Sequence, residues 1–110
     1  MSDELPEELA AHIVDPECSF APPGWHALLL RMHAQMMQVT PDYVLLQVKE
    51  KFEGLRVYVA PDYPQPVAEQ LRACVVYAQA QAQETCATCG GPGRQRPPTR
   101  MVRCDACMNG

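Results

Sequence analysis

Two Cys-x-x-Cys pairs near the C-terminus, Cys86 with Cys89 and Cys104 with Cys107, constrain the fold of this chain more than any other feature. Two intervening residues let the backbone double back, so that both sulfurs of a pair can face one ion, and Gly90 after Cys89 eases the turn. A tetrahedral Zn²⁺ takes four thiolates at about 2.3 Å. The spacing therefore predicts a zinc ribbon or knuckle that binds one structural zinc ion per chain.

Other uses of four cysteines fit less well. Disulfides need an oxidising compartment, and residues 1–6 lack the basic and apolar regions of a signal peptide, so we expect free thiols. A thioredoxin-like site needs only one Cys-x-x-Cys near a βαβ pattern, and iron–sulfur clusters usually have other spacings. A catalytic zinc keeps an open position, usually with histidine or carboxylate among its ligands. Four cysteines leave none, which favours a structural metal.

Length and charge limit what the rest of the chain can be. The 110 residues suit one modest core, and with eleven prolines and few aromatics its packing must depend on Leu, Val, Ala and Met. The net charge is −4, and no stretch of eighteen apolar residues occurs, so we expect a soluble protein without a membrane partner. Zinc would compensate for the small core, because structural zinc contributes about 10–16 kcal/mol of apparent binding energy.

The sequence divides into three segments. Residues 1–23 form an acidic arm with a short amphipathic helix from Pro6 to about Ile13, which either packs on the core or becomes ordered on a partner. Residues 24–85 form the core, and residues 86–110 form the zinc-binding module. Apolar residues at intervals of three and four predict a core helix that runs from Trp25 to about Gln38.

A β-hairpin and a second helix complete the predicted core. Residues 43–51 predict a strand with alternating apolar members, residues 52–54 a turn, and residues 55–59 the return strand. The alternating members are Val44, Leu46 and Val48 on the first strand and Leu55, Val57 and Val59 on the second. The second helix should run from near Pro66 to about Glu84, and its weakly apolar Ala-Gln repeat at 78–83 suggests a stalk that extends away from the core. The fold class is α+β, a small helix–β-hairpin–helix core with a C-terminal zinc ribbon or knuckle.

Residues 47–58, Gln-Val-Lys-Glu-Lys-Phe-Glu-Gly-Leu-Arg-Val-Tyr, resemble a Lys-Glu-Lys-Phe-Gly-Gly-Leu-Arg-Phe-Tyr motif of small phage and prophage proteins. Those proteins share a Gly-Trp helix before the motif, a helix after it and terminal cysteine clusters, so the resemblance covers about residues 24–107. It departs at Glu53 and Val57, where the family often has Gly and Phe. The family is largely of unknown function. The resemblance implies a viral gene product that acts in the cytoplasm of a bacterial host.

Basic side chains on the hairpin and in the cysteine module have two interpretations. They can simply solvate the open face of the sheet, which explains every one of them. Alternatively, basic side chains interleaved with an aromatic ring can hold phosphates or an acidic protein surface. The candidate partner-binding residues are Lys49, Lys51, Arg56 and Tyr58 on the hairpin and Arg94, Arg96 and Arg100 between the cysteine pairs.

Three functional classes follow from these features. No nucleophile with a base, no carboxylate pair and no phosphate loop is visible, so we expect neither catalysis nor a small-molecule substrate. Nucleic-acid binding is the alternative, weakened because four arginines, Asp105 and a Zn²⁺ with four thiolates leave the module only about one net positive charge. The favoured class is non-catalytic binding of a host protein, for which an anti-CRISPR-like inhibitor of bacterial defence is a concrete instance.

Overall fold

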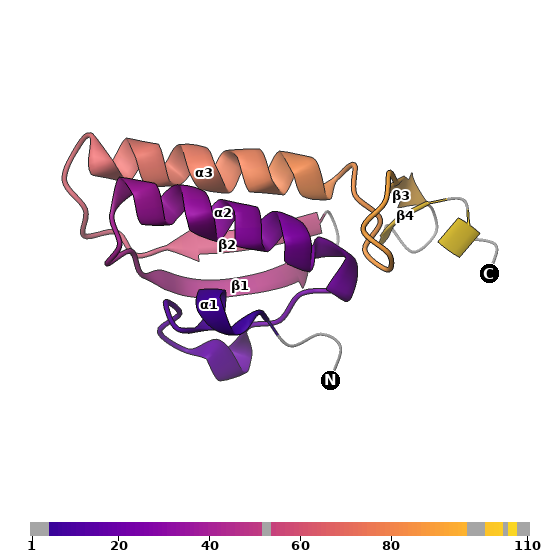
Figure 1. Cartoon of the computed structure of the whole chain (residues 1–110), viewed down its shortest axis with the longest axis horizontal. Coiled ribbons are helices and arrows are strands. Elements are labelled where there is room, and N and C mark those ends of the chain that lie inside the picture. Colours follow the sequence, from indigo (N-terminus) through magenta and orange to yellow (C-terminus); the bar gives the residue numbers. More distant parts are fainter. Residues whose placement is uncertain (1–4, 52–53, 97–100, 105, 108–110) are drawn as a thin grey trace.

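The fold is α+β, as the sequence predicts, with helices over a β-hairpin and a cysteine module at one end (Figure 1). The computed structural model describes residues 5–51, 54–96, 101–104 and 106–107. Its helices are α1 (Glu7–Ala10), α2 (His26–Val39) and α3 (Val67–Ala82), and its strands are β1 (Leu45–Lys51), β2 (Gly54–Val59), β3 (Arg94–Arg96) and β4 (Met101–Arg103). The predicted turn at 52–54 lies largely outside the described residues.

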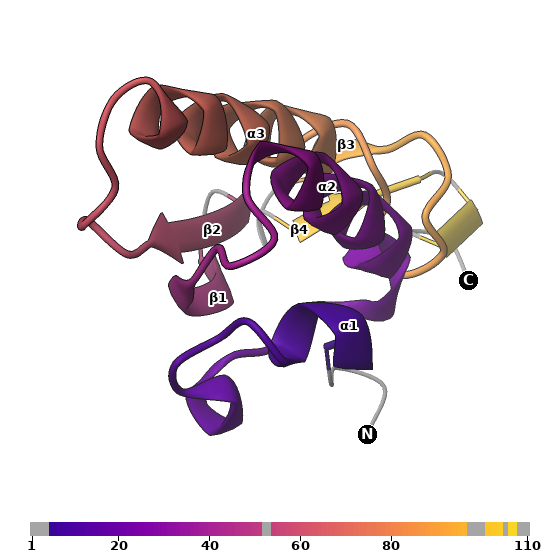
Figure 2. The same cartoon turned by 60° about the vertical axis from the view of Figure 1, so that its left-hand side comes forward.

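The core forms where α2 and α3 pack beside each other against one face of the β1–β2 hairpin (Figure 2). Their buried side chains recur at intervals of three and four, which gives each helix one apolar face. The strands are antiparallel, with Val48 opposite Val57 and Glu50 opposite Leu55. The buried members are Leu28, Leu29, Met32 and Met36 on α2, Leu71, Cys74, Val75, Ala78 and Ala82 on α3, and Leu45, Val48, Leu55 and Val57 on the hairpin.

The alternation predicted for β1 is wrong. Leu45 and Val48 are fully buried, whereas Leu46 is 43% exposed and Val44 lies outside the strand. The register shifts between Leu45 and Gln47, so one extra residue interrupts the ladder. Such an irregularity moves the apolar positions on one side of it to the opposite face. The alternation predicted for β2 is confirmed for Leu55 and Val57, which are buried, while Tyr58 faces solvent.

The N-terminal arm packs on the core. Its helix α1 is shorter than predicted, but Leu9 and Ile13 are buried against the rest of the molecule. The arm then runs along the outer edge of β1 through a 3₁₀ turn at Pro16–Cys18. Four hydrogen bonds of 2.9 Å hold it there: Leu45 N–H to His12 O, Val14 N–H to Leu45 O, Val48 N–H to Ser19 Oγ, and Phe20 N–H to Val48 O.

The end of α3 is not a stalk. Ala78 and Ala82 are buried, so the last turns of the helix belong to the core. Beyond α3, Ala87 and Val102 of the cysteine module also belong to the core cluster. The predicted division of the chain at residue 85 stays a prediction, and the module contributes side chains to the same core as the helices.

Among the described residues, no helix combines the length and the apolar character that are needed to cross a bilayer.

Candidate metal centre

The first cysteine pair sits in a tight turn directly after α3. The Cys86 N–H donates to the Gly91 carbonyl (2.7 Å), and the Gly90 N–H donates to the Cys86 carbonyl (2.9 Å). Gly90 has φ +85°, a conformation that side-chain-bearing residues rarely adopt. The sequence predicts this role for Gly90, and the prediction is confirmed. The turn directs the sulfurs of Cys86 and Cys89 toward the same point.

The second pair is brought back by the small β3–β4 hairpin. The strands are antiparallel, with Arg94 opposite Arg103 and Gln95 opposite Val102. The Ala87 N–H donates to the Val102 carbonyl (2.7 Å), so β4 lies directly against the first turn. Cys104 follows β4 at once and is thereby placed beside the first cysteine pair.

The four sulfurs converge within a space that fits one metal ion. The Sγ atoms of Cys86, Cys89, Cys104 and Cys107 all lie within 4.8 Å of one another. The Cys89 and Cys104 sulfurs are 3.6 Å apart, and none of the chain's cysteines forms a disulfide. A tetrahedron with metal–sulfur bonds of about 2.3 Å has edges of about 3.8 Å, so the spacing and the donor set both match a four-thiolate zinc site.

Burial and hydrogen bonding shift the pKa values of three thiols of the cluster, those of Cys86, Cys104 and Cys107, in different directions. Burial raises the pKa of Cys86, but hydrogen bonds from the backbone around Cys89, Cys104 and Thr88 outweigh it and lower that pKa to about 6. Hydrogen bonds from Cys107 lower the pKa of Cys104, and the same contact raises the pKa of Cys107 to about 12. The Cys107 N–H donates to the Cys104 sulfur at 3.4 Å. Two sulfurs of the cluster are therefore stabilised as thiolates, the form that binds a cation.

The loop before α2 docks the metal module onto the core. The Gly24 N–H donates to the Ala87 carbonyl (2.8 Å), and the Trp25 indole N–H donates to the Thr85 carbonyl (2.9 Å). A Cβ at Gly24 would clash with the Cys86 carbonyl oxygen and lie 2.6 Å from the Ala87 carbonyl carbon. The apolar periodicity predicts Trp25 as a residue of the core helix. It gives no sign that Gly24 and Trp25 attach the cysteine module to the core.

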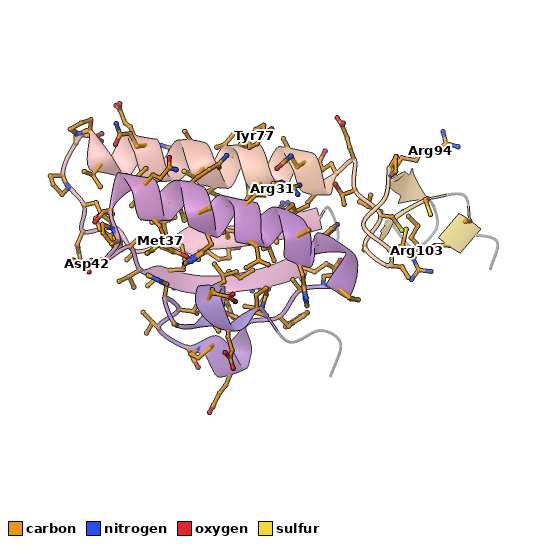
Figure 3. The ribbon with its side chains drawn as sticks, in the orientation of Figure 1. Arg31, Met37, Asp42, Tyr77, Arg94 and Arg103 are labelled. Carbon is orange, nitrogen blue, oxygen red and sulfur yellow. The ribbon has the colours of Figure 1, made fainter. Side chains whose placement is uncertain are left out.

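The predicted partner-binding residues lie on two separate surfaces. Lys49 and Tyr58 share the solvent face of the β1–β2 hairpin, where the Lys49 Nζ lies 5.9 Å from the centre of the Tyr58 ring. Arg56 lies directly opposite Lys49 in the register of the hairpin. Arg94 is exposed on β3, and its side chain points away from that of Arg103 (Figure 3). The side chains of Lys51 and Arg96 and the whole of Arg100 lie outside the described part of the chain.

Comparison of the chain with protein-family models, with characterised proteins and with solved structures finds no match in any of the three. Of the features that carry the resemblance to phage proteins, the structure supports the four-cysteine cluster. The membership of a family stays a prediction, and the cluster itself is the firmest functional feature of the molecule.

Proposed function

We propose that this protein is a small, zinc-stabilised binding protein that acts without catalysis. The observation that supports a bound zinc ion is the convergence of four cysteine sulfurs within 4.8 Å of one another. Four thiolates would fill a tetrahedral zinc ion, so no position is left for water or substrate, and the ion serves the fold. Cys86, Cys89, Cys104 and Cys107 would hold it, and it would fix the position of the β3–β4 hairpin.

The solvent face of the β1–β2 hairpin supports the binding role. Leu46 and Tyr58 are large apolar side chains that are about two-fifths exposed, and Lys49 lies over the Tyr58 ring. Tyrosine is enriched at protein interfaces, where it supplies contact area at low entropic cost. This composition favours a protein partner with an acidic rim over a bare phosphate backbone.

The biological setting of the proposal depends on the resemblance alone. A small phage-type protein would act in the cytoplasm of a bacterial host and bind a host protein there. Inhibition of a host defence system, in the manner of an anti-CRISPR protein, is one form that this activity can take.

An affinity purification of the tagged, zinc-loaded chain from bacterial cells tests the proposal. We expect one host protein to be recovered in a fixed ratio, and the double variant Lys49→Glu with Tyr58→Ala to lose it. Arg31→Glu on the exposed side of α2 is a matched charge-reversal control and should retain the partner. Recovery of nucleic acid alone, released steeply as salt rises, would instead establish the nucleic-acid alternative.

A further inference from the structure

The two outer edges of the β1–β2 hairpin differ in how they are covered. The outer edge of β1 is hydrogen-bonded to the arm at Leu45 and Val48. The outer edge of β2 has no neighbouring strand among the described residues, and Figure 2 shows β2 with a strand on one side only. An open edge of this kind presents main-chain donors and acceptors to any extended segment that lies along it.

The hydrogen bonds of β2 show which main-chain groups point outward. The Ala60 N–H donates to the Val44 carbonyl (3.0 Å). The main-chain N–H and carbonyl groups of even-numbered residues in this segment therefore point toward β1. The Val57 N–H instead donates to the Gln79 side-chain oxygen of α3 (3.1 Å). Successive residues of a strand alternate in direction, so the main-chain N–H and carbonyl of Val59 also point outward. Gln79 thus occupies the outward donor of Val57, and Val59 is the outward position that an added strand can pair with.

A groove of about 550 Å³ follows this open edge between β2 and α3. Val75 and Val76 line one wall, and Tyr58 with Leu46 lines the other. Val76 is 57% exposed, so this wall of the groove presents an apolar side chain to solvent. An extended peptide points successive side chains to opposite sides, so alternate apolar side chains would meet these two walls.

One charged side chain lines the described part of the groove. Arg72 of α3 is exposed, and it makes no hydrogen bond or ion pair with any residue that the structure describes. A guanidinium at the rim of an apolar groove pairs well with a carboxylate, because its planar donors match both carboxylate oxygens. The groove therefore favours an acidic extended segment over a basic one.

We propose that this groove binds an extended segment of another protein, which adds to β2 as a further strand and places a carboxylate beside Arg72. The segment would carry apolar side chains at alternate positions, as in other cases of strand addition to an exposed sheet edge. The inference rests on the proposed role in protein binding and specifies how a partner is held.

A peptide selection tests this inference on the full zinc-loaded chain. A displayed library of linear twelve-residue peptides is selected against the protein, and the enriched sequences are synthesised. We expect alternating apolar residues with one Asp or Glu at a fixed position. Arg72→Glu should weaken the binding of such a peptide by about tenfold, and replacing the peptide's acidic residue with Lys should restore it. Arg31→Glu, the matched control outside the groove, should leave binding unchanged.

Amide hydrogen exchange provides a second test of strand addition to β2. Bound peptide should slow exchange of the Val59 amide, which an added strand would protect, whereas binding elsewhere would leave this amide unchanged. The inference is wrong if no peptide is enriched, if the enriched peptides bind Arg72→Glu as well as wild type, or if the chain pairs only with a second copy of itself. The host protein could be lost from the Lys49→Glu, Tyr58→Ala double variant and still bind Arg72→Glu as well as wild type. That result would support the proposed function and reject binding in the groove.

Discussion

At the scale of single residues, the close contact between Gly24 and the first cysteine turn leaves no room for a side chain at this position. We expect Gly24→Ala to destabilise the fold by about 1–3 kcal/mol, because the new methyl group must displace the backbone of Cys86 and Ala87. Urea denaturation of the zinc-loaded protein measures the loss. Gly91→Ala is the matched control, since its Cβ would meet only the Cys89 sulfur at 3.6 Å. Equal stability of the two variants would contradict this account of Gly24.

A partly buried cluster of rings joins the arm, α2 and the segment before β1. The His12 ring stacks on Tyr43 with centroids 4.0 Å apart, and His33 Nδ1 lies 2.7 Å from the Tyr43 hydroxyl. Burial lowers the pKa of His33, the neighbouring His12 lowers it further, and Glu8 opposes the shift. Burial also raises the pKa of Tyr43. The folded state therefore favours the neutral forms of His33 and Tyr43.

This preference predicts an acid-sensitive stability. The folded state binds the His33 proton less tightly than the unfolded chain, whose histidines titrate near pH 6.5. The stabilisation by neutral His33 is complete above that pH, and it falls as the pH drops below it. Thermal melting between about pH 7 and pH 5 should show this loss, and His33→Gln, which can still bond the Tyr43 hydroxyl, should reduce it. A pH dependence of stability in His33→Gln equal to that of wild type would refute the assignment.

At the scale of elements, the side chain of Gln79 connects α3 to the open edge of β2. Its side-chain oxygen accepts a hydrogen bond from the N–H of Val57, a residue that is 6% exposed. Gln79→Ala leaves this donor without a partner in a nearly dry position, so we expect a loss of about 1–2 kcal/mol in the free energy of unfolding. Gln70→Ala on the exposed side of the same helix is the control, with an expected change of less than about 0.5 kcal/mol. A comparable loss in both variants would mean that helix propensity, and not this bond, is responsible.

The elements themselves were largely predictable from the sequence, and their irregularities were not. Periodic apolar residues locate α2 and α3, and the alternation of Leu55 and Val57 locates β2, because burial imposes those periods. The register shift after Leu45 leaves no mark in a single sequence, so the faces of β1 were assigned wrongly. The buried end of α3 was missed for a related reason. Alanine is only weakly apolar, so a run of alanine and glutamine does not mark a buried helix face.

The cysteine site was predictable because its ligands are marked by residue type and spacing. Two Cys-x-x-Cys pairs have few other structural uses, whereas the contacts that dock the site involve ordinary residues. The bond from the Trp25 indole to the Thr85 carbonyl joins positions 60 residues apart. No local sequence pattern indicates such a contact, so the attachment of the module to the core could be seen only in the structure.

At the scale of the whole molecule, the metal module and the core should be coupled. Ala87 and Val102 belong to the core cluster, and Gly24 and Trp25 bond to the segment around Cys86. We expect chelation of the metal to lower the melting temperature of the entire chain and to speed amide exchange at the start of α2 as well as in β4. An α2 amide pattern that is unchanged after chelation would show that the module unfolds independently.

The most direct test of the metal centre is the zinc content of the purified chain, measured by elemental analysis beside two single-cysteine variants. Wild type should hold one zinc per chain, Cys104→Ser should lose it, and Cys74→Ala should retain it, because Cys74 is buried on α3 outside the cluster. Wild type without zinc while its thiols are reduced, or a Cys104→Ser variant with full zinc content, would contradict the four-thiolate site.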